Sequence, residues 1–206
     1  MPDPGHAREF DFSGGVLCLD FANTIEDRPL CLKESLSDWS DLAAWAEQAG
    51  LVSPREASVL RRRAQANRRA ADRGFRAARE LRECTYRVFH ATAAGEAPSA
   101  ADLAQLNDAV ARALRHARVV RDGHGYAWGW AHGDVTLDRV LWPVARSAAD
   151  LLVSSARTDV RECASETCSW LFLDLSPRRS RRWCSMKTCG NRDKVRRFYA
   201  RQRAGG

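Results

Sequence analysis

The sequence Cys163-Ala-Ser-Glu-Thr-Cys168 is followed, after fifteen residues, by Cys184-Ser-Met-Lys-Thr-Cys189. Each segment leaves four residues between its two cysteines, which is enough for a tight turn that brings both thiolates to one edge of a tetrahedral Zn²⁺ ion. Four thiolates fill the coordination shell and leave no position for an activated water molecule. The spacing therefore predicts one zinc ion with a structural role, bound by Cys163, Cys168, Cys184 and Cys189.

Two disulfide bonds, or four unconnected thiols, are the alternatives for these four cysteines. The first residues include Asp3, Glu9 and Asp11 and lack the basic and apolar regions of a signal peptide. No stretch approaches the roughly 18 to 20 apolar residues of a membrane span. We therefore expect a cytoplasmic protein without a membrane partner. Because cytosolic thiols are reduced, zinc is favoured over disulfides.

Three further cysteines, Cys18, Cys31 and Cys84, are isolated in the sequence. We expect them to be buried as small apolar side chains, because a catalytic thiol needs an activating base that the sequence does not assign. The chain also lacks a phosphate-binding glycine loop, a nucleophile elbow and a zinc-protease motif. These observations predict a protein that is not an enzyme.

Positive charge is concentrated in residues 178–203. This segment has eleven Lys and Arg residues and one acid, Asp193, so its formal charge is +10, whereas the whole chain carries +7. Nearly all the surplus charge in one short segment predicts a surface that binds a polyanion. The alternative is a solvated basic helix with flexible ends.

The predicted contact residues lie on a turn between the cysteine pairs and on a helix after Cys189. They are Arg178, Arg179, Arg181, Arg182, Lys187, Asn191, Arg192, Lys194, Arg196, Arg197 and Arg201. Residues 170–175 are strand-like, and a hairpin from them to 181–183 is expected to carry one cysteine pair to the other. Gly190 would free the backbone and Asn191 would cap the helix. Val195, Phe198 and Tyr199 would hold that helix against the hairpin.

Hydrophobic periodicity predicts a mainly helical domain over residues 1–157, followed by a cysteine module over 158–206. The apolar run 12–27 is compatible with a strand or a helix. Four helices are expected after Ser37, Ser53, near Phe75 and after Ser99, the third with Phe75 to Thr92 on one face and the fourth with Leu103, Leu106, Val110 and Leu114 facing inward. Residues 117–130 predict a β-hairpin around Gly123, and a last helix includes 140–152 with Pro143 in its first turn.

Two other groups of residues have less specific interpretations. Asp20, Asn23, Trp128, Trp130 and Arg146 are candidates for a ligand pocket, against the alternatives of backbone capping and core packing. The segment 61–82 has nine arginines. An ordinary solvated face is the preferred interpretation of that segment, and an auxiliary phosphate contact is the alternative. If one helix continues through the segment, Arg62, Arg69 and Arg76 lie on one face of it.

The run Cys189-Gly190-Asn191-Arg192, with Trp170-Leu-Phe-Leu-Asp after the first cysteine pair, resembles the CGNR zinc-finger family. Residues 15–24 and 141–152 resemble the ABATE domain that accompanies this finger in bacterial stress-response transcription regulators. The resemblance implies a DNA-binding finger. The expected fold is mainly α with a small β-hairpin (α+β), a helical N-terminal domain plus a C-terminal treble-clef-like zinc finger with four cysteine ligands.

Three classes of function follow from these features. The first is a transcription regulator whose finger contacts double-stranded DNA and whose N-terminal domain receives an unidentified small-molecule effector or partner. The second is an RNA-binding protein, for which Tyr199 and Trp183 are the obvious stacking residues of the finger. The third is an enzyme or a protein-interaction module with the finger as a tether. The oligomeric state is left open, a homodimer included.

Overall fold

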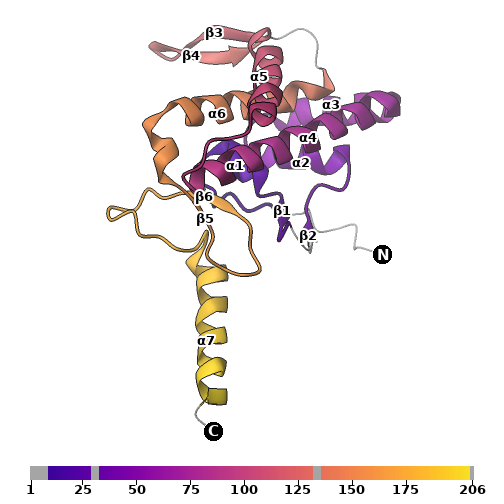
Figure 1. Cartoon of the computed structure of the whole chain (residues 1–206). Helices are drawn as coiled ribbons and strands as arrows, with labels where there is room; N and C mark the ends of the chain where they lie inside the picture. Colours follow the sequence, from indigo (N-terminus) through magenta and orange to yellow (C-terminus); the bar gives the residue numbers. More distant parts are fainter. Residues whose placement is uncertain (1–8, 29–32, 132–135, 205–206) are drawn as a thin grey trace.

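The computed structural model describes residues 9–28, 33–131 and 136–204, and its architecture is a helical domain followed by a small cysteine-rich module (Figure 1). The helices of the domain are α1 (Leu17–Ala22), α2 (Trp39–Gln48), α3 (Pro54–Ala66), α4 (Arg68–Ala93), α5 (Ala100–Leu114) and α6 (Trp142–Val153). A short strand pair, β1 (Ile25–Glu26) and β2 (Lys33–Glu34), follows α1. The predicted mainly helical fold with small β-hairpins is confirmed.

The long helix α4 is at the centre of the domain and contacts α1, α2, α3 and α5. Helix α6 packs mainly on α1 and α5. Large side chains from distant parts of the chain fill the core, among them Phe21, Trp45 and Phe89, all fully buried. Cys18 and Cys84 are buried in the same core, where burial raises the pKa of Cys18 to about 12 and that of Cys84 to about 11. Both therefore remain neutral thiols, as small apolar residues would require, while Cys31 lies outside the described residues.

Helix starts follow the local capping chemistry. The Ser53 hydroxyl accepts from the Glu56 N–H, the Glu56 carboxylate accepts from the Ser53 N–H, and Pro54 occupies the first turn, so α3 begins with a complete capping box. Ser99 caps α5 by accepting from the Asp102 N–H at 3.1 Å. The predicted cap at Ser37 is wrong, because the Asp38 carboxylate accepts from the N–H groups of residues 40 and 41 instead.

The arginine-rich segment does not form one helix. Helix α3 ends at Ala66, Asn67 caps the next helix by accepting from the Ala70 N–H at 3.0 Å, and α4 begins at Arg68. Arg62 is therefore on a different helix from Arg69 and Arg76, so the continuous helix that a stripe over all three requires is absent. On α5, the buried positions include Ala109 and Ala113, whereas Leu114 is exposed rather than inward-facing.

Two further elements lead to the cysteine module. The predicted hairpin is present as β3 (Ala117–Asp122) and β4 (Gly125–Trp130), and Gly123 supplies the positive φ of 57° that its two-residue turn needs. The short helix η1 (Leu137–Leu141) precedes α6, in which Pro143 occupies the first turn as expected, and η2 (Ser155–Asp159) follows it. The cysteine module begins after η2, at residue 160.

The strand pairing in the module differs from the prediction. Strand β6 (Leu171–Leu173) pairs antiparallel with β5 (Val160–Glu162), which precedes the first cysteine, and not with residues 181–183. The latter segment returns beside the first cysteine pair through a bond from the Ala164 N–H to the Arg182 carbonyl, 2.8 Å long. Val160, Leu171 and Leu173 belong to the core of the helical domain, so the β5–β6 hairpin joins the two parts of the molecule.

Candidate metal centre and nucleic-acid interface

The four predicted ligands lie together. The sulfur atoms of Cys163, Cys168, Cys184 and Cys189 are all within 4.8 Å of one another. Cys184 Sγ is 3.8 Å from Cys168 Sγ and 3.7 Å from Cys189 Sγ. A zinc tetrahedron with Zn–S bonds of about 2.3 Å has edges of about 3.8 Å between sulfurs. The donor set and its spacing fit one structural zinc ion, whose chemistry is to cross-link the fold.

Two turns hold the cysteine pairs in place. The first pair is closed by the hairpin, because the Cys163 N–H donates to the Trp170 carbonyl at 2.9 Å. In the second pair, the Ser185 carbonyl accepts from the Gly190 N–H at 3.0 Å and closes η3 (Met186–Gly190), a single π-helical turn. The Cys184 N–H faces Cys163 Sγ at 3.5 Å and so connects the two turns.

Gly190 and Asn191 act differently from the prediction. Gly190 has no positive φ, but a Cβ at this position would lie 2.8 Å from Met186 Sδ, so the glycine provides close packing of the turn. Asn191 is the first residue of α7 (Asn191–Ala204), and its side-chain amide donates to the Lys187 carbonyl at 3.1 Å. It thus satisfies the preceding π turn and does not cap the helix.

Helix α7 projects from the module away from the helical domain (Figure 1). The expectation that Val195, Phe198 and Tyr199 hold it against a hairpin is wrong, since these side chains are 55%, 58% and 58% exposed. The module's apolar cluster is small and closed around Phe172 and the cysteines, with Trp170 and Trp183 at its edge. The aromatic side of α7 is not part of this cluster, and the contacts of α7 with the module come from its first two turns.

Ten of the eleven predicted contact residues are exposed, and Arg181 is the exception. Its Nε donates to the Trp183 carbonyl at 2.8 Å, and its guanidinium lies 4.5 Å from the centre of the Phe172 ring. Arg181 therefore stabilises the metal-binding turns and is not free to contact a ligand.

Some of the exposed cations have partners within the chain. Asp193 accepts contacts from both Arg196 and Arg197, and Arg196 also pairs with Glu166. Arg192 donates to the Thr167 hydroxyl at 2.7 Å, and Arg179 pairs with Asp159 at 3.2 Å. These are surface contacts, which contribute little to stability and exchange readily for phosphate oxygens. The free cations of the described surface include Arg178, Lys187, Lys194 and Arg201.

Comparison with known families agrees with this geometry. A family model for the ABATE domain, described as a "putative stress-induced transcription regulator", matches residues 15–155, more than half of the chain. The chain belongs to the ABATE family. A model of the CGNR zinc finger matches residues 160–202, which include all four cysteines. A search of curated proteins finds no match.

The residues predicted to line a ligand pocket in the ABATE domain lie in two separate groups. Asp20 and Asn23 bind backbone: Asp20 Oδ1 accepts from the Gly14 N–H at 2.8 Å, and the Asn23 amide exchanges two hydrogen bonds with the Leu171 backbone, at 2.8 and 2.9 Å. The alternative of backbone capping therefore describes both residues. Because Leu171 is on β6, these two hydrogen bonds connect the ABATE domain to the CGNR finger.

The second group is on the β3–β4 hairpin. Trp128 is 56% exposed and lies over the Arg146 guanidinium, with 4.1 Å between that group and the ring centre. Trp130 packs toward Trp142, whose ring stacks on His116 at 3.9 Å. Trp130 thus packs on the core, as the alternative interpretation expected. Trp128 and Arg146 form a cation–π pair at the surface.

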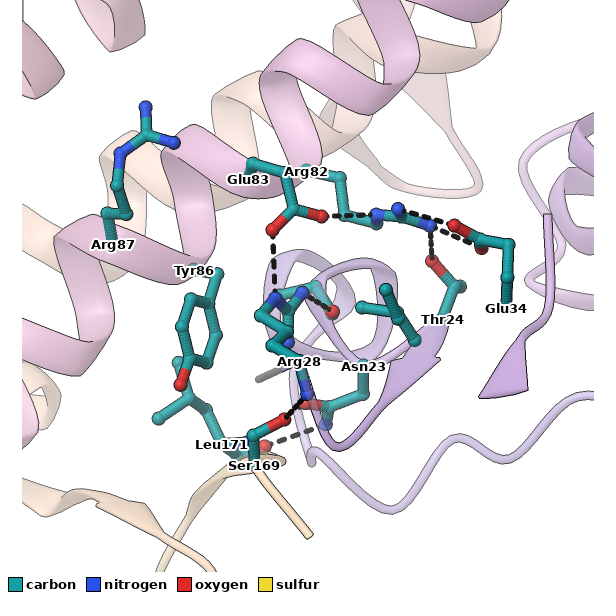
Figure 2. A network of polar contacts seen from close by, with 12 residues as sticks. Asn23, Thr24, Arg28, Glu34, Arg82, Glu83, Tyr86, Arg87, Ser169 and Leu171 are labelled. Atoms are coloured by element: carbon teal, nitrogen blue, oxygen red, sulfur yellow. Dashed lines mark hydrogen bonds and ion pairs between the residues drawn. The ribbon is translucent and has the colours of Figure 1, made fainter. Parts of the chain in front are cut away.

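A buried ion network at the junction was missed in the sequence (Figure 2). Arg82, whose side chain is 1% exposed, makes a two-pronged contact with Glu34 at 2.7 and 2.8 Å and donates to Glu83 at 2.8 Å. Glu83 also accepts from Arg28 Nε at 2.9 Å. Arg82 is four positions from Ala78 and three from Thr85, both of which are buried, and this spacing places it on the buried face of α4. The interpretation of a solvated face is therefore wrong for Arg82.

The network extends from α4 into the CGNR finger (Figure 2). The Arg28 guanidinium lies 3.7 Å from the centre of the Tyr86 ring, and the Arg28 N–H donates to the Ser169 hydroxyl at 3.1 Å. The Trp170 indole N–H donates to the Ile25 carbonyl at 3.1 Å. The finger is therefore seated on the ABATE domain by specific polar contacts as well as by the β5–β6 hairpin.

The buried carboxyl of Asp20 leads to a prediction on pH dependence. Burial raises the pKa of Asp20 to about 6, above its unfolded value of about 3.9, so the folded state binds the proton more tightly. The protonated carboxyl of Asp20 contributes fully to the free energy of unfolding below pH 4, and this contribution is lost as the pH rises through 6. Asp20→Asn keeps a carbonyl acceptor for the Gly14 N–H, and we expect it to stabilise the protein at pH 7.5 by on the order of 2 kcal/mol, with no gain at pH 4.

Urea unfolding of the zinc-loaded protein and of Asp20→Asn at both pH values measures this difference. Asp108→Asn, at an exposed position on α5, is the matched control for removal of one negative charge. A gain that is the same at pH 4 and pH 7.5 would contradict the burial of a charged carboxylate at residue 20.

Proposed function

We propose that this chain is a DNA-binding transcription regulator, in which the zinc-bound CGNR finger contacts double-stranded DNA and the ABATE domain receives a signal. The observation that supports this most strongly is the exposed basic surface of the turn 178–182 and helix α7, with Asp193 as the one acid among residues 178–203. Zinc has a structural role in this proposal and no catalytic step is assigned to the chain. The protein would act in the cytoplasm.

The side chains on α7 are arranged in a way that suits a duplex. Val195, Phe198 and Tyr199 form one stripe along the exposed helix. Cations flank the stripe on both sides, with Arg192 and Arg196 on one flank and the residues 194, 197 and 201 on the other. Cations can neutralise phosphates on both sides of a groove while the central side chains approach base edges, including the thymine methyl group.

Membrane binding through a spanning helix has no support in the described residues, where no helix combines the length and the apolar character that a crossing requires. The exposed aromatic pair Phe198 and Tyr199 favours RNA as the second candidate, since single-stranded nucleic acids stack their bases on such rings. Both candidates use the same cations. They differ in whether a duplex or a single strand is bound more tightly.

Charge reversal on α7 tests the proposed interface. Arg196→Glu combined with Arg197→Glu should weaken binding to a mixed-sequence DNA duplex by on the order of 100-fold or more at 0.1 M salt, because two phosphate contacts become repulsive. Zinc content should stay at one ion per chain, since neither residue belongs to the four-sulfur ligand set. Fluorescence anisotropy at several salt concentrations measures the affinity and its salt slope, and metal analysis measures the zinc.

The matched control is Arg118→Glu combined with Arg121→Glu, which makes the same charge change on the β3–β4 hairpin at the opposite end of the molecule (Figure 1). Equal loss of affinity in both double variants would mean that net charge and not the α7 surface governs binding. Tighter binding to a matched single-stranded RNA than to the duplex would replace DNA with RNA as the target. Full-length variants are preferable to a truncation near Thr158, which would remove Leu171 and Leu173 from the domain core.

A further inference from the structure

A groove lies on the ABATE domain, away from the metal centre. It runs between the end of α3, the first half of α4 and η1, and it has a cavity volume of about 810 Å³. Its floor consists of small or apolar side chains, namely Ala66, Ala70, Ala77 and Leu137. This volume and an apolar floor are typical of sites for small organic molecules, which lie within roughly 300 to 1,000 Å³.

The groove wall has cations without partners. Arg73 on α4 and Arg112 on α5 are exposed, and neither makes an ion pair within the described residues. Arg63 is a third guanidinium in the lining, while Glu80 and Asp138 are the carboxylates. Arg73 and Arg112 are thus the two available guanidinium groups of the lining, and the planar Arg fork binds a carboxylate with two parallel hydrogen bonds.

Two buried donors without partners in the described residues lie in the groove lining and in a neighbouring pocket. A smaller pocket of about 60 Å³ shares Ala77, Arg112 and Asp138 with the groove and is also lined by Trp142. Trp142 is 3% exposed, and its indole N–H has no hydrogen-bond partner in the described part of the chain. The buried hydroxyl of Thr136, on the groove wall, also lacks a partner there. A ligand that carries hydrogen-bond acceptors would satisfy both groups.

We propose that this groove binds an organic anion, a carboxylate carried on a flat apolar body. The carboxylate contacts Arg73 and Arg112, and the apolar body lies on the alanine floor. We expect binding in this groove to regulate the finger, because α4 connects the two. This expectation rests on the signal-receiving role proposed for the ABATE domain. Helix α4 lines the groove with residues 70–77, and its later residues 82–86 form the ion network that holds the finger (Figure 2).

The test is calorimetric titration of the zinc-loaded full-length chain with 2-naphthoate, without nucleic acid. We expect saturable one-site binding that is at least tenfold weaker for neutral 2-naphthamide, which has the same rings and no charge. Arg73→Gln combined with Arg112→Gln should weaken 2-naphthoate binding at least tenfold and leave thermal stability unchanged. Arg79→Gln, an exposed arginine on α4 outside the groove lining, is the control and should bind as the unmodified protein does.

The inference would be overturned by the absence of 2-naphthoate binding at millimolar concentration, by equal affinity for the amide, or by unchanged affinity in the double glutamine variant. Because the titration contains no nucleic acid, these outcomes do not depend on whether the finger binds DNA. A chain that binds 2-naphthoate through Arg73 and Arg112 but fails to bind any nucleic acid would retain the site and lose the proposed function.

Discussion

Replacing Cys184 by serine is expected to eliminate stoichiometric zinc binding and to unfold the CGNR finger. The Cys184 side chain is buried and its sulfur is within 3.8 Å of both Cys168 Sγ and Cys189 Sγ, so it is central to the tetrahedron. A serine hydroxyl does not replace a thiolate at such a site, and structural zinc contributes an apparent free energy of about 10–16 kcal/mol in small zinc modules. A loss of that size is comparable to the whole stability of an ordinary domain.

The consequence should reach beyond the finger. Leu171 and Leu173 on β6 belong to the core of the ABATE domain, so release of the first cysteine turn weakens the β5–β6 hairpin and exposes that core. We expect Cys184→Ser to lower the thermal midpoint of the helical signal as well. A chelator that removes zinc from the unmodified chain should have the same effect.

Metal analysis gives the zinc content, and circular dichroism during heating gives the stability of the helices. Cys18→Ala is the matched control, because Cys18 is equally buried but lies in the helical core. It should retain one zinc per chain and lose only the few kcal/mol of a small core truncation. Retention of one tightly bound zinc by Cys184→Ser would contradict the four-sulfur site.

The features that could be predicted from the sequence are those encoded by near neighbours. Ser53 and Ser99 cap their helices through residues three positions later, and each pair of zinc ligands is only five residues apart. The Gly123 turn is also local. In each case the interacting atoms are fixed by one turn of backbone, so the spacing alone is informative.

The features that could not be predicted depend on partners far away in the chain. Strand β6 has two candidate neighbours in sequence, and its choice of β5 is determined by burial of Leu171 and Leu173 beneath α1, which local pattern does not encode. Asn23 and Leu171 are 148 residues apart. The exposure of Phe198 and Tyr199 has the same origin, since an apolar stripe on a helix indicates a partner without saying whether the partner is in the same chain.

Arg82→Ala is expected to destabilise the ABATE domain by about 3 kcal/mol. The substitution leaves Glu34 and Glu83 without the buried guanidinium that both contact, and removal of one member of a buried ion network typically costs roughly 3–5 kcal/mol. The lower end of that range applies here because the two carboxylate side chains are 30% and 35% exposed and water can reach them. Arg79→Ala, at an exposed position three residues earlier on α4, should change stability by less than about 0.5 kcal/mol.

The pH dependence separates this loss from a simple packing defect. Burial raises the pKa of Glu83, but the charges and hydrogen bonds of Arg28 and Arg82 outweigh it and hold the pKa below the ordinary value. A depressed pKa stabilises the fold above the unfolded value of about 4.3, and the stabilisation is lost as the pH falls through the lower folded value. Arg82→Ala removes part of that depression, so its stability difference from the unmodified protein should shrink between pH 6 and pH 3. A difference that stays constant over this range would show that Arg82 acts through its packing volume alone, and the network would then have no electrostatic part in seating the finger on the ABATE domain.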